Sequence, residues 1–104
     1  MRAEVLKGHL DTLLLAAVSD EPAHGYRIVE RLRERSGGVF ALPEGTVYPA
    51  LYRLESAGLL SSRWLNDSHR RRRVYRLTQR GRAALKAGRE EWRGFARAVT
   101  AALL

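Results

Sequence analysis

Residues 45–58 read GTVYPALYRLESAG and have two unlike sides when they are placed on a helix. At about 100° per residue, the apolar side holds Val47, Ala50, Leu51, Leu54 and Ala57. The other side holds Gly45, Tyr48, Pro49, Tyr52 and Ser56, with Arg53 at its border. We therefore expect a helix over residues 44–57 that buries one side, exposes the other and ends at Gly58.

Two helices are predicted before this one. Residues 6–18 carry apolar residues at the i, i+3, i+4, i+7 spacing of a helix, and the SDEP sequence of residues 19–22 ends it. Residues 24–35 form the second helix, which Ser36-Gly37-Gly38 closes. The VFAL sequence of residues 39–42 then predicts a short edge strand.

A hairpin and a long helix are predicted after it. Two strands, residues 59–65 and 72–77, are rich in leucine, valine and aromatic residues, and the polar residues 66–71 join them. Thr78 is expected to cap a helix that begins at Gln79 and continues to the end of the sequence.

Apolar residues recur every seven positions on this last helix, as they do in a coiled coil. They are Leu85, Trp92 and Val99, then Gly88, Phe95 and Ala102, with Ala96 and Leu103 beside them. Three short helices cannot cover so long a stripe, so it predicts a partner helix from a second copy of the chain. The alternative is that the stripe folds back on its own domain.

Length and composition restrict the class of protein. The chain has 104 residues, of which 45% are apolar and 29% are charged, and this is enough for one small domain. The absence of cysteine excludes a disulfide framework and a thiolate metal site. The longest strongly apolar run, residues 13–18, is too short to cross a bilayer or to form the core of a secretory signal. We therefore expect a cytoplasmic protein without a membrane partner.

The sequence contains no recognisable catalytic constellation. His9, His24 and His69 lie in separate predicted elements and have no paired acid, nucleophile or metal-ligand spacing. A glycine-rich phosphate loop of the Walker or dinucleotide-binding type is also missing. We expect no enzymatic activity, no cofactor and no metal.

The formal net charge of +8 is concentrated in one part of the chain. Between Arg63 and Arg82 the sequence holds eight arginines and a single acidic residue, Asp67, whereas the rest is nearly neutral. Arginines 70–73 fall at the tip and the returning edge of the predicted hairpin. Such a basic finger can reach a phosphate backbone. The alternative is a solvated arginine face with no partner.

Together these elements predict a fold that is mainly α with a small antiparallel β-hairpin. Their order is that of a winged helix-turn-helix domain, in which the third helix enters the major groove and the hairpin touches the neighbouring backbone. Tyr48 and Tyr52 could donate to phosphates or base edges, and Arg53 could pair with a phosphate or a guanine. The alternative for the two tyrosines is half-buried packing.

The chain resembles the PadR-like transcriptional regulators over almost its full length. The resemblance rests on LAAV at residues 15–18 with PAHGY at 22–26, on residues 45–55 with GLL at 58–60, and on RVYRLT at 73–78 with Gly81 and Arg82. The single long C-terminal helix is similar to that of the short-chain branch of the family.

This resemblance implies a dimeric winged helix-turn-helix repressor. Residues 1–78 would form the DNA-binding domain and residues 79–104 a dimerisation helix, which packs with residues 6–18 of the partner; the two parts form one folding unit. The predicted dimer interface consists of Leu6, Leu10, Leu14, Leu85, Trp92, Phe95, Ala96, Val99 and Leu103.

The resemblance also implies DNA-facing residues on two elements. On the third helix they match Thr46, Tyr48, Pro49 and Arg53, beside the outward Tyr52, and on the wing they match Arg70, Arg71 and Arg72. The backbone at His24 and Gly25 could hold a phosphate at a helix N-terminus, whereas Tyr26 is expected to pack between helices. Family members commonly have two glycines in the wing, where this chain has DSHR at residues 67–70.

Trp92 has two interpretations. Similar multidrug-sensing regulators have a tryptophan in the matching stretch, where it lines a cavity in which flat aromatic compounds stack. By that resemblance Asp11 and Leu15 would be its neighbours in a pocket for a small aromatic effector. The alternative is that Trp92 only fills the seam between two copies.

The function with most support from the sequence is a sequence-specific regulator that binds a pseudo-palindromic site in double-stranded DNA as a homodimer. Two other functions stay open. A sequence-independent nucleic-acid binder would use the same arginines but would not need a polar, aromatic side on the third helix. A winged-helix protein-interaction module would keep the fold without contacting DNA.

Overall fold

The computed structural model describes residues 8–67 and 70–104. In chain order the elements are α2 (Leu10–Ala17), β1 (Ala23–His24), α3 (Gly25–Arg35), α4 (Glu44–Ser56), β2 (Leu60–Asp67), β3 (Arg70–Leu77) and α5 (Gln79–Leu103). The strands form one antiparallel sheet in the order β1-β3-β2. The fold is therefore mainly α with a small antiparallel sheet, as predicted. No helix in the described ranges is long and apolar enough to cross a membrane.

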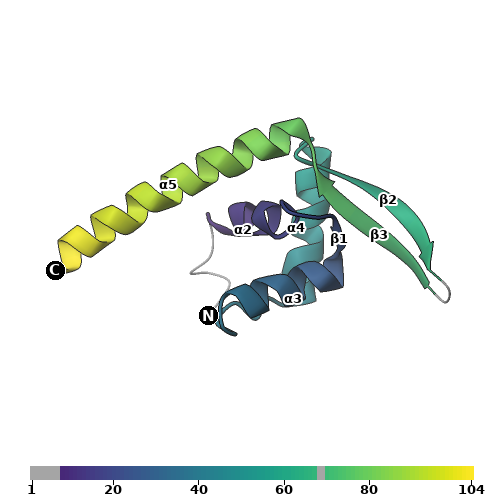
Figure 1. Cartoon of the computed structure of the whole chain (residues 1–104), viewed down its shortest axis with the longest axis horizontal. Helices are drawn as coiled ribbons and strands as arrows, with labels where there is room; N and C mark the ends of the chain where they lie inside the picture. The colour runs from purple at the N-terminus through teal and green to yellow at the C-terminus, as the bar shows by residue number, and fades with distance from the viewer. Residues whose placement is uncertain (1–7, 68–69) are drawn as a thin grey trace.

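Two elements extend away from a helical centre. Helices α2, α3 and α4 lie together, the β2–β3 hairpin projects to one side, and α5 extends to the other (Figure 1). The molecule is correspondingly elongated, with extents of 53 × 28 × 21 Å.

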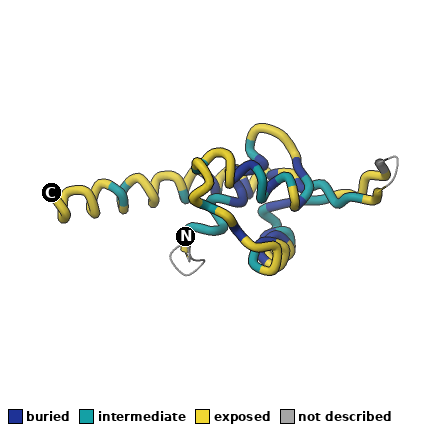
Figure 2. Tube along the Cα trace, turned by 90° about the horizontal axis from the view of Figure 1, so that it is seen from below, coloured by how far each residue is buried: buried dark blue, intermediate teal, exposed yellow. Residues whose placement is uncertain are grey.

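The hydrophobic core lies where the three short helices meet the base of the hairpin and the start of α5. Figure 2 shows buried residues in this centre and exposed residues along most of α5. The largest side chains that are fully buried are Leu14, Leu15, Ile28, Val47, Leu51, Leu54 and Leu60. Leu85 is 3% exposed and joins this core from α5. One contiguous core thus includes every helix that the structure describes.

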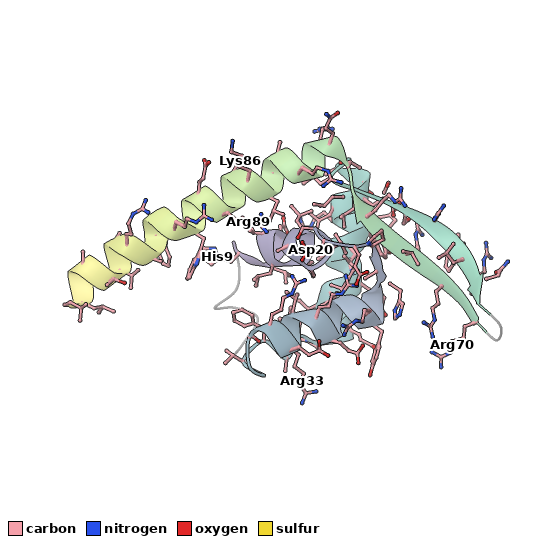
Figure 3. The ribbon with its side chains drawn as sticks, viewed as in Figure 1. His9, Asp20, Arg33, Arg70, Lys86 and Arg89 are labelled. Atoms are coloured by element: carbon pink, nitrogen blue, oxygen red, sulfur yellow. The ribbon has the colours of Figure 1, made fainter. Side chains whose placement is uncertain are left out.

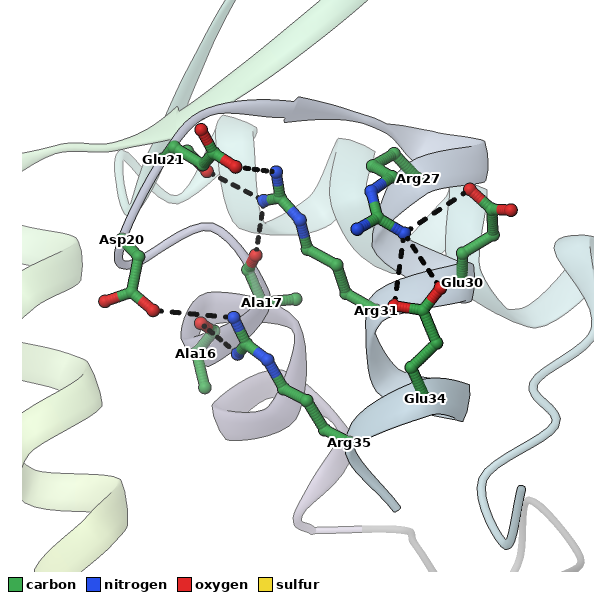
Figure 4. A network of polar contacts seen from close by, with 9 residues as sticks. All are labelled: Ala16, Ala17, Asp20, Glu21, Arg27, Glu30, Arg31, Glu34 and Arg35. Carbon is green, nitrogen blue, oxygen red and sulfur yellow. Dashed lines mark hydrogen bonds and ion pairs between the residues drawn. The ribbon is translucent and has the colours of Figure 1, made fainter. Parts of the chain in front are cut away.

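Two arginines of α3 hold the end of α2 (Figure 4). The last carbonyls of a helix lack partners within the helix. Arg31 Nη1 donates to the carbonyls of Ala17 and Glu21, both over 2.9 Å, and Nη2 lies 3.0 Å from the Glu21 carboxylate. One turn later, Arg35 donates to the Ala16 carbonyl over 3.2 Å. Arg31 is only 8% exposed, so its charge is accommodated by these acceptors and by the negative end of the α2 dipole.

The helix predicted over residues 6–18 is shorter in its described part. Helix α2 begins at Leu10, because Gly8 has a φ of 95° and lies with His9 in a turn. Such a backbone conformation is incompatible with a continuous helix. The predicted interface residue Leu6 lies outside the described residues.

The prediction of an edge strand at residues 39–42 is wrong. This segment is irregular, and the third strand is the pair Ala23–His24, which lies opposite Tyr75 and Val74 of β3. The apolar character of residues 39–42 has another cause, because Leu42 is 5% exposed and belongs to the core.

The hairpin is longer than predicted. Its register runs from Leu60 opposite Leu77 to Asp67 opposite Arg70, so residues 66–67 and 70–71 are paired strand rather than loop. Only residues 68–69 of the predicted loop remain between the strands, and they lie outside the described residues. The arginines of β3 are therefore held at strand positions.

We predict that Arg31→Ala lowers the free energy of unfolding by about 1–3 kcal/mol, because the buried Ala17 carbonyl at the end of α2 loses this donor. Urea unfolding followed by circular dichroism measures the change. The matched control is Arg33→Ala on the same helix, where the side chain is exposed. Equal effects of the two substitutions would show that the Arg31 contacts do not stabilise the fold.

Candidate nucleic-acid interface

Helix α4 exposes a narrow surface made mostly of small side chains. Val47, Ala50, Leu51 and Leu54 are buried on its inner side. The outward residues Gly45, Pro49, Tyr52 and Ser56 are exposed, and we call them the α4 outer face. Tyr52 is its one large side chain and is 68% exposed. Small neighbours leave room for another molecule to approach the helix closely.

The side of α4 next to the hairpin is fixed by a polar cluster. Glu55 accepts a hydrogen bond from the Ser62 hydroxyl over 2.6 Å and from Arg73 Nη2 over 2.9 Å. Arg73 Nε also donates to the Ser62 oxygen over 2.6 Å. These contacts join the last turn of α4 to both β2 and β3.

The opposite side of α4 is fixed by an ion pair with α2. Arg53 Nη1 donates to Asp11 Oδ2 over 3.0 Å, and Nη2 donates to Oδ1 over 2.7 Å. The hydrogen bond and the charge of Asp11 raise the pKa of Arg53 above its ordinary value. Both charged residues of the last two turns of α4, Arg53 and Glu55, are therefore paired within the chain.

Tyr48 packs on the start of α3. A Cβ atom at Gly25 would overlap the Tyr48 ring, so only glycine permits this approach. Burial, and then the charge of Glu44, raises the pKa of the Tyr48 phenol above its ordinary value. The hydroxyl therefore stays protonated near neutral pH and can donate a hydrogen bond. Tyr48 remains 42% exposed beside the α4 outer face.

His24 lies between the start of α3 and the hairpin. Its Nδ1 accepts a hydrogen bond from the backbone N–H of Arg27 over 3.3 Å, which makes it the N-cap of α3. Its Nε2 lies 3.2 Å from Arg72 Nη1. A guanidinium can only donate, and a neutral imidazole has one acceptor nitrogen, so the ring serves one of the two contacts at a time. Burial, and then Arg72, lowers the pKa of His24 below its ordinary value.

The hairpin carries its arginines on both faces. Arg71 and Arg73 share a face with Trp64, since Trp64 lies directly opposite Arg73 in the ladder. The Arg71 guanidinium lies 4.5 Å from the centre of the Trp64 ring, at cation–π distance. Arg72 points to the other face, toward His24. Arg70 and Arg71 are exposed, and Figure 3 places Arg70 near the far end of the hairpin.

The predicted DNA-facing residues differ in exposure. Tyr52, Tyr48, Pro49, Arg53, Arg70 and Arg71 are exposed, whereas Thr46, Arg72 and His24 are partly buried and Gly25 is buried. Tyr26 was expected to pack between helices, and this is wrong. It is 56% exposed and stacks on His24, with ring centroids 6.5 Å apart, because it lies in the first turn of α3.

The predicted interface residues divide into two groups. Trp92, Phe95, Val99 and Leu103 form an exposed stripe on α5, which we call the α5 apolar stripe. Leu10 and Ala96 are partly buried. Leu14 and Leu85, and the predicted pocket residue Leu15, are at most 3% exposed because they lie in the core of their own chain. Their side chains therefore offer no surface to a partner or to a ligand.

His9 connects the start of α2 with the α5 apolar stripe. Its ring centroid lies 5.3 Å from that of Trp92 and 5.6 Å from that of Phe95. Asp11 is turned away from this aromatic group and toward Arg53. The predicted effector residues Asp11, Leu15 and Trp92 thus do not line one cavity within a single chain. Among residues 8–67 and 70–104, no group of three His, Asp or Glu side chains could hold a metal ion.

Comparison with known proteins decides the family. Residues 14–87 match the Transcriptional regulator PadR-like family. The chain belongs to this family. The PadR-like family consists of transcription regulators, so this chain is a transcription regulator and not an enzyme.

Several PadR-like relatives and solved structures resemble the chain closely. Transcriptional regulator Rv3488 of Mycobacterium tuberculosis is 41% identical over 86 residues, which cover 83% of this chain and 78% of the relative. A transcriptional regulator from Clostridium thermocellum has a TM-score of 0.86 at 29% identity, covering 93% of this chain and 95% of its own. A PadR family regulator from Clostridium difficile has a TM-score of 0.81 at 35% identity, with 92% and 99% covered.

A more distant structure shares the fold. It is Bacillus subtilis PadR in complex with operator DNA, with a TM-score of 0.69 at 23% identity, covering 75% of this chain and 45% of that chain. The winged-helix architecture predicted for this PadR-like chain is confirmed by these similarities.

We predict that protonation of His24 destabilises the fold. Its lowered pKa means that the unfolded chain binds the proton more tightly than the folded chain. The part of the folding stability that depends on a neutral His24 is therefore present above about pH 6.5 and is lost as the pH falls. His24→Asn keeps a good N-cap but cannot titrate. Urea unfolding between about pH 7.5 and pH 5.5 should therefore show the wild type losing more stability than His24→Asn. Parallel pH profiles would contradict the prediction.

Proposed function

We propose that the chain is a sequence-specific, homodimeric repressor that binds a pseudo-palindromic site in double-stranded DNA. The observation that carries the proposal is the α4 outer face, where an exposed Tyr52 stands among small residues beside an arginine-bearing hairpin. A helix with one exposed side of this kind fits the major groove, which is wide enough to admit an α-helix.

In this proposal α4 supplies the contacts that depend on sequence. Tyr52 projects furthest from the helix, and its hydroxyl can donate to or accept from base edges. Tyr48 and Thr46 lie on either side of the outer face and can contact a base or a phosphate. Gly45 and Pro49 allow the backbone to approach the floor of the groove.

The hairpin supplies contacts that are independent of sequence. Arg70 and Arg71 are exposed on the outer half of the hairpin, and the Arg71 guanidinium lies over the Trp64 ring in a cation–π contact. Arginine side chains that neutralise phosphates release counterions, so their contribution falls as the salt concentration rises. The Glu55–Ser62–Arg73 cluster would hold these arginines at a constant distance from α4.

The start of α3 provides a third contact with the backbone. Its first turn has no acidic residue, and the positive end of the helix dipole favours an anion there. The phenol of Tyr26 is exposed at the same place and can donate to a phosphate oxygen.

Dimerisation is supported by the α5 apolar stripe. Trp92, Phe95 and Leu103 are 49%, 51% and 78% exposed on one helix, which a soluble monomer would not favour. We propose that residues 79–104 pair with a second copy, aided by the start of α2, and that residues 1–78 bind DNA. A two-fold dimer would present two α4 helices to half-sites about one helical turn apart. Release by a small aromatic effector at Trp92 belongs to the same proposal.

We predict that selection from a random duplex library enriches a two-fold symmetric site. Binding without enrichment would instead support a sequence-independent binder, and no binding at low or near-physiological salt would support a protein-interaction module.

The wing arginines can be tested on the selected site. Arg70→Ala/Arg71→Ala should weaken all duplexes alike and reduce the slope of log affinity against log salt by about 2. The control is Arg33→Ala/Arg89→Ala, which removes two exposed arginines from α3 and α5, away from the hairpin (Figure 3). A changed sequence preference would contradict the role of the hairpin.

The dimer is tested separately. We predict that Trp92→Glu converts the protein to monomers in sedimentation velocity, because a charge replaces a large apolar surface at the interface. Ala101→Glu is the matched control, since Ala101 is exposed and lies on the opposite side of α5 at about 100° per residue. A stable dimer of Trp92→Glu would place the interface elsewhere.

A further inference from the structure

The ion pair between Asp11 and Arg53 joins two elements that have different tasks in the proposed function. Arg53 belongs to α4, which would contact DNA, and Asp11 belongs to the first turn of α2. The two residues are 42 positions apart in sequence, and their side chains meet in a bidentate contact of 2.7 and 3.0 Å. With Gly8 and Leu10 they line a small pocket of about 190 Å³.

The chemistry of the contact makes it exclusive. A guanidinium presents its donors on a small number of edges, and the edge formed by Nη1 and Nη2 is occupied by the Asp11 carboxylate. Bidentate contact with a phosphate, or with O6 and N7 of guanine, requires two parallel donors of the same kind. Arg53 therefore cannot use this edge for DNA while Asp11 holds it.

We propose that Asp11 withholds Arg53 from DNA, so that the two compete for the same guanidinium edge. This inference rests on the proposed function, because it concerns how the DNA-binding surface of that function is regulated. Asp11 acts on DNA binding through Arg53 and is itself a positioning residue. In the free protein the pair is closed, and binding of DNA through Arg53 opens it.

Asp11 lies in the first turn of α2, close in sequence to a residue that contacts the α5 apolar stripe. Asp11 is two residues after His9, and the His9 ring contacts Trp92 and Phe95. A rearrangement of these aromatic side chains, on dimerisation or on binding of a ligand, would thus act on the same helical turn that carries Asp11. The competition is in this way connected to the surface proposed for the second copy.

The exposure of the two side chains sets the size of the effect. The Arg53 side chain is 59% exposed and that of Asp11 is 44% exposed. Ion pairs so accessible to water contribute little, so their removal should alter affinity about two- to five-fold. The pair is a restraint of modest strength, and a phosphate or a guanine can displace its carboxylate.

The experiment is a double-mutant cycle on the DNA site selected as above. The affinities of wild type, Asp11→Asn, Arg53→Gln and the double variant are measured at one salt concentration, with dimer content checked by sedimentation. We expect Asp11→Asn to bind about two- to five-fold more tightly than wild type. In the Arg53→Gln background, the same change should have no effect.

Controls separate this competition from a general effect of charge. Glu44→Gln removes an exposed carboxylate from the start of α4, and its effect on affinity should persist in the Arg53→Gln background. Asp11→Ser provides a second variant if Asp11→Asn is impaired in folding, as judged by urea unfolding. The inference is overturned if Asp11→Asn binds as wild type or more weakly, or if its gain persists without Arg53. Failure of the wild type to bind any duplex would instead overturn the proposed function, and this inference with it.

Discussion

The Glu55 carboxylate is the contact on which the relation between α4 and the hairpin depends. It accepts hydrogen bonds from Ser62 on β2 and from Arg73 on β3, and Arg73 also donates to Ser62. The polypeptide between α4 and β2 is a short turn over residues 57–59, which fixes one end of the hairpin only. The cluster adds a second point of attachment between α4 and the hairpin.

Helices could be predicted from the sequence because their signals are local. The bounds of α3 and α4 agree with prediction to within one residue, and Thr78 caps α5 by accepting from the Gly81 N–H as expected. The sheet depended on distant partners. β1 consists of two residues, Ala23 and His24, whose strand conformation comes from their register with β3, and no local pattern distinguishes them from the apolar segment at residues 39–42.

The exposed side chains of the candidate site could be predicted from helical geometry. The contacts of these side chains with residues from other elements could not. The wheel of α4 placed Tyr48 and Tyr52 on the exposed side, and both are exposed. The position of Arg53 at the border of this exposed side predicted an available cation, but its carboxylate partner comes from a different helix. Trp64 was absent from the predicted site, although its position opposite Arg73 could have been found from the correct hairpin register.

Helix α5 approaches the rest of the chain closely at two glycines near its start. At Gly81 a Cβ would overlap the Leu59 carbonyl, and at Gly88 it would overlap the Thr12 side chain. The helix continues about 22 Å beyond Gly88, roughly twice the distance between the two glycines. The far end thus lies about three times as far from Gly81 as Gly88 does. A rigid rotation of the helix about Gly81 that displaces Gly88 by about 1 Å would therefore move the far end by about 3 Å. In the proposed homodimer, a larger side chain at position 88 would therefore change the separation of the two DNA-binding surfaces.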